Sequence, residues 1–222
     1  MAKKILIISA HPDDETIGMG GAMLKHRAAG DALYWLILTD AVRPKWSQKY
    51  IDQKELEIKA IAKFFGITKT FRSHFPTMHL NALSSDVITD AISKIITGVR
   101  PDVVYCPPPN DINSDHRAAF QAALVATRPL LQSSVREFIA YEIPVTTRFV
   151  YAASGNFFVP NLYMDISRFL KKKIQAFKLY KTEARSFPHP RSPKGLEILA
   201  RERGLAIAHD AAEAFISVRS SR

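Results

Sequence analysis

The sequence predicts an α/β fold: a Rossmann-like, doubly wound and mostly parallel β-sheet flanked by helices, with a C-terminal elaboration. Two observations predict this fold. Strand-like and helix-like patterns alternate through the first two thirds of the 222 residues, which is the rhythm of βαβ units. The first apolar run, at residues 5–8, is continuous rather than alternating, as expected for a strand buried on both faces of a parallel sheet.

Each element has its own support in the pattern. Five strands are predicted, at residues 4–10, 33–39, 69–71, 103–106 and 137–142, of which the third has the weakest signal. Helices are predicted at about residues 18–29, 50–65, 84–98 and 115–127. Gly30 and Gly66 stand where helices should end, and Pro101 punctuates the chain before the fourth strand.

The rhythm changes after residue 144. An aromatic stretch is predicted to form a hairpin or an ordered loop; it contains Phe149, Tyr151, Phe157 and Phe158. A long helix at about 165–183 and a shorter one at about 193–204 should follow. No repeat, low-complexity tract or linker interrupts the chain, so we expect residues 1–222 to form a single domain. No heptad or apolar stripe stands out, so a homo-oligomer is neither predicted nor excluded.

Composition favours a cytoplasmic protein. The chain has one cysteine, Cys106, which excludes an internal disulfide framework and fits a reducing compartment. The N-terminal apolar run is too short for a signal peptide. No segment approaches the ~20 apolar residues of a membrane-spanning helix. We therefore expect no membrane span.

The formal net charge of +10 is concentrated towards the C-terminal third, for example at residues 171–173. We favour the ordinary interpretation, a solvated basic face. The alternative is attraction to an anionic partner, such as a nucleotide-linked sugar or a phosphorylated glycolipid. Nucleic acid has little support as a partner, since the sequence has neither zinc-finger spacing nor an alternating basic and aromatic stripe.

Four ionisable residues directly follow the first predicted strand, in the run His-Pro-Asp-Asp-Glu at residues 11–15. Ligands bind at the carboxyl ends of strands in open α/β sheets, and uncompensated charge there is costly. His11 and Asp14, three residues apart in one turn, are suited to chelating a divalent cation. Asp13 would remain free to handle a proton.

A second polar cluster, residues 107–117, follows the fourth predicted strand and leads into a helix. The first and fourth strands of a doubly wound sheet are commonly neighbours, which would place His116 beside His11 and Asp14. Two imidazoles and one carboxylate leave a fourth position open, as in catalytic zinc sites. Zinc is the first expectation, although nitrogen and oxygen ligands also suit iron, cobalt or nickel.

Residues 10–15 (AHPDDE), together with residues 115–117 (DHR), resemble the LmbE-like, or PIG-L, zinc-dependent N-deacetylases. The resemblance runs nearly end to end, and its most specific part is the hexapeptide directly after the first strand. Lys54-x-x-Glu57 is similar to the family's Arg-x-x-Glu helix, with lysine replacing arginine. Residues 212–215 (AEAF) are similar to its C-terminal Ala-Glu-x-Phe signature.

The resemblance implies roles for individual residues. His11, Asp14 and His116 would be the metal ligands, and Asp13 the general base that activates water and then delivers the proton to the departing amine. Asp115 would orient an imidazole.

Other residues would support this site. Glu15 would support the loop or the following helix terminus. Arg117 would hold a carboxylate of the site or an anionic part of the substrate. Lys54 and Tyr141 complete the set expected to support the site or line the pocket.

One departure from the family pattern bears directly on the chemistry. Many members carry a histidine three residues before the last ligand, where it helps to stabilise the tetrahedral oxyanion, and this chain has Asn113 there. An amide donates a hydrogen bond but carries no charge and relays no proton. Either Asn113 suffices, or another histidine substitutes, for which His209 is our candidate, or activity is reduced.

Three other functions have partial support in the sequence. Residues 18–21 (GMGG) superficially match a dinucleotide-binding fingerprint, but Met23 stands in place of the final glycine. We expect these glycines to let the backbone pack closely against the sheet instead. A metal-dependent phosphohydrolase is the second alternative, although phosphoryl chemistry usually favours all-oxygen magnesium sites. A catalytically impaired sugar-binding protein is the third, suggested only by Asn113.

We therefore expect a metal-dependent amidohydrolase that removes an N-acyl group, acetyl in the first instance, from an amino-sugar-containing substrate such as N-acetylglucosamine. The sugar is implied mainly by the family resemblance. The substrate would be a small molecule or a glycoconjugate. The basic surface slightly favours an anionic substrate. Trp46, in a polar loop, is the better of the two tryptophans for covering a sugar ring.

Overall fold

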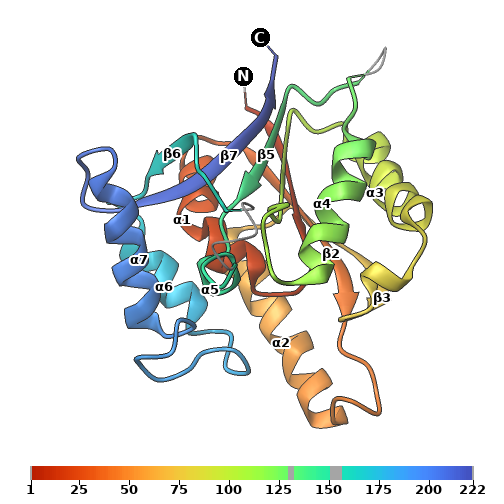
Figure 1. Ribbon diagram of the computed structural model, residues 1–222, viewed down its shortest axis with the longest axis horizontal. Coiled ribbons are helices and arrows are strands. Elements are labelled where there is room, and N and C mark those ends of the chain that lie inside the picture. The colour runs from red at the N-terminus through yellow and green to blue at the C-terminus, as the bar shows by residue number, and fades with distance from the viewer. Residues whose placement is uncertain (1, 130–132, 151–156, 222) are drawn as a thin grey trace.

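A seven-stranded mixed β-sheet forms the centre of the computed structural model, which describes residues 2–129, 133–150 and 157–221 (Figure 1). The strand order is β3-β2-β1-β4-β5-β7-β6. Its strands are β1 (Lys4–Ser9), β2 (Ala32–Asp40), β3 (Lys69–Pro76), β4 (Val103–Cys106), β5 (Glu137–Tyr141), β6 (Leu162–Asp165) and β7 (Ala212–Ser220). β1 to β5 pair in parallel, whereas β7 runs antiparallel to both β5 and β6. The predicted fold class is confirmed.

Helices cover both faces of this sheet. They are α1 (Asp14–Ala28), α2 (Gln48–Phe65), α3 (Ser85–Val99), α4 (Ser114–Ala126), α5 (Pro144–Thr147), α6 (Leu170–Phe177) and α7 (Pro193–Leu205), with a 3₁₀ turn, η1, at Leu80–Ala82. In Figure 1, α3 and α4 lie on one side of the sheet, and α1, α6 and α7 on the other. Both chain ends emerge at the edge of the molecule where β1 begins and β7 ends.

β1 is buried on both faces, as its continuous apolar pattern predicts. Ile5 and Ile7 pack into the core beneath α1, α2 and α6, while Leu6 and Ile8 pack into the core beneath α3 and α4. All four side chains are fully buried. β1 also pairs with β4, so the predicted neighbours across the switch point of the sheet are confirmed.

α1 packs unusually close to its neighbours and is kinked at Met19, whose φ and ψ are not helical. A Cβ on Gly18 would lie 2.4 Å from the Tyr141 ring, and a Cβ on Gly21 would lie 2.6 Å from Ile166. Glu213 accepts hydrogen bonds from the backbone N–H groups of Gly21 and Ala22, at 2.8 and 2.7 Å. The glycine run thus serves close packing, and Glu213 of the AEAF segment braces the kinked helix.

The C-terminal third differs from the prediction. The strands β6 and β7 were not predicted, and the helix expected at 165–183 is much shorter, spanning Leu170–Phe177. Asp165 ends β6 with a local turn, because its side chain accepts hydrogen bonds from the backbone N–H and hydroxyl of Ser167.

The predicted hairpin or ordered loop is only partly described. Tyr151 lies outside the described residues, Phe149 follows α5, and Phe157 and Phe158 lie in an irregular segment that leads to β6. Within the described part of the chain, none of the helices combines the length and the apolar character needed to cross a membrane.

Candidate metal centre and cavity

Three potential metal ligands meet at the carboxyl ends of β1 and β4. His11 follows β1 by two residues, Asp14 is the first residue of α1, and His116 lies in the first turn of α4. His116 Nε2 lies 3.3 Å from His11 Nδ1 and 3.2 Å from Asp14 Oδ1. His11 Nδ1 lies 3.5 Å from Asp14 Oδ2. One donor atom from each residue therefore lies within 4.8 Å of the other two.

These separations fit a four-coordinate transition-metal ion. A tetrahedral zinc site with bonds of about 2.0–2.1 Å has ligand atoms about 3.3–3.4 Å apart. Each imidazole also has a carboxylate on the nitrogen that faces away from the cluster. His11 Nε2 lies 3.0 Å from Asp115 Oδ2, and His116 Nδ1 lies 2.9 Å from Asp111 Oδ2. Such carboxylate–histidine pairs orient metal-ligating imidazoles, so the donor set fits the group.

The electrostatics of the cluster favour a cation. Burial acts to lower the pKa of His11, but hydrogen bonds with Asp115 and Asp14 raise it to about 10. Burial acts in the same direction on His116, and Asp14 and Asp111 raise its pKa to about 9. Burial acts to raise the pKa of Asp14, and the two imidazoles bring it well below its usual range. The carboxylates thus create a negative environment that a divalent cation would also neutralise.

Asp13 lies beside these residues in a strained and unusual environment. Its backbone φ of 144° is rare for a residue other than glycine. Its side chain is buried, and Oδ2 has no hydrogen-bond partner among the described residues. The nearest cation is Arg191, whose Nη2 lies 3.7 Å away, beyond hydrogen-bond distance. Burial raises the pKa of Asp13 to about 6, an effect that Arg191 opposes.

Glu15 supports the loop that carries Asp13. Glu15 Oε2 accepts a hydrogen bond from the backbone N–H of Asp13 at 3.2 Å. Its Oε1 accepts from the hydroxyls of Thr16 and Tyr180, at 2.6 and 2.8 Å. Since Glu15 is fully buried and Tyr180 comes from the segment after α6, the strained turn is fixed from two sides.

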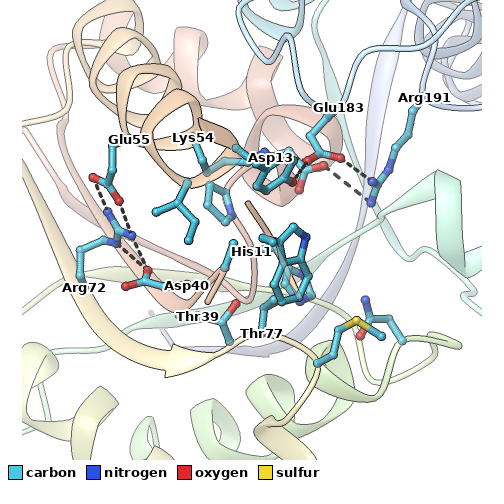
Figure 2. Close-up of a pocket in the computed structure, with 17 residues that line it drawn as sticks. His11, Asp13, Thr39, Asp40, Lys54, Glu55, Arg72, Thr77, Glu183 and Arg191 are labelled. Atoms are coloured by element: carbon cyan, nitrogen blue, oxygen red, sulfur yellow. Dashed lines mark hydrogen bonds and ion pairs between the residues drawn. The ribbon is translucent and has the colours of Figure 1, made fainter. Parts of the chain in front are cut away.

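His11 and Asp13 open onto a cavity of about 230 Å³ (Figure 2). Its wall includes aromatic, hydroxyl and charged side chains; among them are Thr39, Asp40, Trp46, Tyr50, Lys54, Glu55, Arg72, Thr77, Asn113, Glu183 and Arg191. The volume lies just below the range of about 300–1,000 Å³ that is usual for pockets of drug-sized ligands, which suits a compact polar group. Lys54 is buried against this wall, where its Nζ donates to Glu183 at 2.7 Å.

Two other predicted site residues, Asn113 and Arg117, lie at the start of α4. Asn113 lines the cavity, but its side-chain oxygen caps α4 by accepting from the backbone N–H of Asp115. Arg117 donates to the backbone carbonyl of Asp111, so it braces the loop that carries one imidazole partner.

Tyr141 and His209, which were expected to line the pocket and to act on the oxyanion, do not line the cavity. Tyr141 is buried beneath α1, and its hydroxyl donates to the carbonyl of Ile8. His209 is exposed in the turn before β7, where it interacts with Ile207 and Asp165.

Several charged residues of the site were not among the predicted site residues, among them Asp111, Glu183 and Arg191. Asp111 lies five residues before His116 in the same polar cluster, a spacing that was a usable signal. Glu183 and Arg191 come from the irregular segment between α6 and α7, which carries no recognisable motif. The Glu183 carboxylate links three side chains, because it accepts hydrogen bonds from Lys54, from Arg191 at 2.8 Å and from the hydroxyl of Tyr50 at 2.8 Å.

The part of the chain that carries the three potential metal ligands is similar in sequence to a known protein family. The profile of the family described as "PIG-L: GlcNAc-PI de-N-acetylase" matches residues 6–127, which is more than half of the chain and includes all three potential metal ligands. A curated relative, the diacetylchitobiose deacetylase of Thermococcus kodakarensis, is 26% identical over 199 residues, covering 82% of this chain and 70% of the relative.

Solved structures share the fold at lower identity. The N,N'-diacetylchitobiose deacetylase from Pyrococcus horikoshii superimposes with a TM-score of 0.77 at 22% identity, covering 96% of this chain and 83% of that protein. GalB, the 4-carboxy-2-hydroxymuconate hydratase from Pseudomonas putida KT2440, also gives a TM-score of 0.77, at 19% identity with 99% and 98% coverage. Because the fold hosts both kinds of enzyme, the reaction has to be argued from the site.

Proposed function

The chain belongs to the PIG-L family of de-N-acetylases, and we propose that it is a metal-dependent hydrolase that releases acetate from an N-acetylated amino sugar. The observation that carries the proposal is a juxtaposition. The His11, Asp14 and His116 donors lie next to Asp13, whose buried Oδ2 has no hydrogen-bond partner among the described side chains. A general base needs a free oxygen of this kind.

His11, Asp14 and His116 would hold one divalent transition metal, with zinc as the first candidate. When bound, such an ion polarises an amide carbonyl and lowers the pKa of water, which is the chemistry that amide hydrolysis requires. The mixed nitrogen and oxygen donor set argues against magnesium, and therefore against the phosphohydrolase alternative.

Asp13 would transfer the proton. Its carboxylate accepts a proton from the attacking water as the new C–O bond forms, and then gives that proton to the amide nitrogen as the C–N bond breaks. The products are acetate and a free amine. Arg191, 3.7 Å from Oδ2, opposes the effect of burial on this carboxylate without occupying the oxygen through a hydrogen bond.

Asn113 lies where the chain departs from the family pattern. Its side-chain oxygen is engaged in capping α4, so only its amide N–H groups remain to face the cavity and contact a developing oxyanion. We propose that Asn113 supplies a neutral hydrogen bond there, because His209, the other candidate, interacts with Ile207 and Asp165 instead.

Amine release is the direct test. The zinc-, cobalt-, nickel- or iron(II)-loaded protein should form a primary amine from N-acetylglucosamine or its disaccharide, and removal of the metal by a chelator should abolish this. p-Nitrophenyl phosphate serves as the control for phosphatase activity. Phosphate release without amine release from any N-acetylated sugar would contradict the proposal.

A further inference from the structure

Arg72, Asp40 and Glu55 form a charged wall of the cavity that the proposed reaction does not use. In Figure 2 they lie on one side of His11, and Glu183 and Arg191 lie on the other. Arg72 donates through Nε and Nη2 to Asp40 Oδ1, and through Nη1 to Glu55 Oε2 at 3.1 Å. Its Nη2 also lies 2.9 Å from Glu55 Oε1. Both the side and the end of the guanidinium are therefore occupied by carboxylates.

The other two cations of the lining are paired in the same way. Lys54 Nζ donates to Glu183 Oε1 at 2.7 Å, and Arg191 Nη1 donates to Glu183 Oε2 at 2.8 Å. Among the described lining residues there are four carboxylates and three cations; the carboxylates are those of Asp13, Asp40, Glu55 and Glu183. The formal charge of +10 belongs to the whole chain, whereas in this lining the carboxylates outnumber the lysine and arginine side chains by one, with His11 counted as a neutral metal ligand.

This arrangement disfavours an anionic group on the substrate. A phosphate or carboxylate at this wall could not form a bidentate pair with Arg72, because both pairs of guanidinium N–H groups already bind carboxylates. The negative charges of Asp40 and Glu55 would also repel it. A sugar hydroxyl meets no such penalty, because it can donate a hydrogen bond to either carboxylate. Trp46, half-buried in the lining, adds an apolar face of the kind that packs against a sugar ring.

We infer that the cavity selects an uncharged, hydroxyl-rich sugar unit beside the reacting amide and rejects a phosphate or carboxylate there. Asp40 and Glu55 are the specificity-determining residues, because they hold Arg72 in ion pairs. This assignment rests on the proposed deacetylase function and runs against the anionic substrate suggested by the charge of the chain. A metal held by His11, Asp14 and His116 would add positive charge at the reacting amide, not at this wall.

The test compares two probes, N-acetylglucosamine and its 6-phosphate, by kcat/KM for amine release with the metal-loaded protein. The wild type should prefer the uncharged probe at least tenfold. Asp40→Asn and Glu55→Gln each remove one of the two carboxylates that pair with Arg72, and each should reduce that preference at least fivefold. The Glu55→Gln variant should fold normally, because the Glu55 side chain is 45% exposed, so it tests the inference even if Asp40→Asn misfolds. Asp90→Asn, on the exposed face of α3, makes the same charge change as Asp40→Asn and should leave the preference unchanged.

Equal or better turnover of the phosphorylated probe by the wild type, or an unchanged preference in both wall variants, would overturn the inference while leaving deacetylation intact. If neither probe releases amine, the proposed function fails on these sugars, and calorimetric binding of the same two probes decides the inference. Tighter binding of the uncharged probe supports it, whereas tighter binding of the phosphate, or binding of neither, overturns it.

Discussion

The carboxylate of Asp111 lies 2.9 Å from Nδ1 of His116, while Nε2 of the same ring faces His11 and Asp14. This contact selects the ring nitrogen that is offered to a metal, and it makes the imidazole a stronger donor. Asp111 Oδ2 also accepts a hydrogen bond from the hydroxyl of Thr146, which fixes the carboxylate in place.

Asp111→Asn should therefore weaken metal binding by about 10–100-fold, because the amide removes the charge behind His116 while nearly keeping the side-chain shape. Competition against a chromophoric chelator measures the affinity. Asp115→Asn tests the equivalent contact on His11 and should act in the same direction. Asp111→Asn protein with wild-type affinity would refute the orienting role.

Asp13→Asn should keep the metal and lose turnover. The variant retains the size of the side chain but has no carboxylate to accept a proton, so kcat for amine release should fall by about 10²–10⁴-fold. Metal content and kcat have to be measured on the same preparation. Turnover close to that of the wild type would rule out Asp13 as the base.

Asp13→Gly should be more stable than Asp13→Ala, although both should be inactive. The backbone φ of 144° costs an alanine about 1–3 kcal/mol and costs glycine little, and the greater flexibility of glycine in the unfolded chain offsets part of that gain. We expect a difference of about 1 kcal/mol in the free energy of unfolding by urea. An Asp13→Gly variant that is less stable than Asp13→Ala by about 0.5–1 kcal/mol, the cost of glycine flexibility alone, would mean that the turn is not strained.

Gly21→Ala should destabilise the fold by about 1–3 kcal/mol, because its Cβ would lie 2.6 Å from the Ile166 side chain. Gly98→Ala is the matched control, since it is also helical and a Cβ there has no neighbour within 4 Å. That control should be neutral or stabilising by up to about 1 kcal/mol. Similar effects of the two substitutions would argue against close packing of α1.

The parallel part of the fold could be predicted because its signals are local. Residues 5–8 form a continuous apolar run, and Gly66, with its left-handed φ of 65°, ends α2 where the glycine was expected to. β6 and β7 gave weaker signals. β6 is only four residues long and half-buried, and the first three residues of β7 are two alanines and a glutamate, which are not typical of strands. Their pairing depends on contacts across the sheet edge that no local pattern reveals.

The metal-ligand cluster could be anticipated for a similar reason. His11 and His116 both follow predicted strand ends, and topology brings those ends together. The charges that surround Asp13 could not be anticipated. Glu183 and Arg191 reach the cavity from an irregular segment, because Glu183 bridges Lys54 and Arg191 in the folded chain. Such long-range ion pairs leave no periodic trace in the sequence.

The central claim is that His11, Asp14 and His116 hold a catalytic metal, and metal content measured by mass spectrometry on the wild type and Asp14→Ala tests it most directly. We predict about one equivalent of zinc, or of another divalent transition metal, per wild-type chain. Asp14→Ala protein with an unchanged circular dichroism spectrum should have lost that metal. Wild-type protein without tightly bound metal, even after incubation with zinc, or equal metal content in the folded variant, would contradict the account.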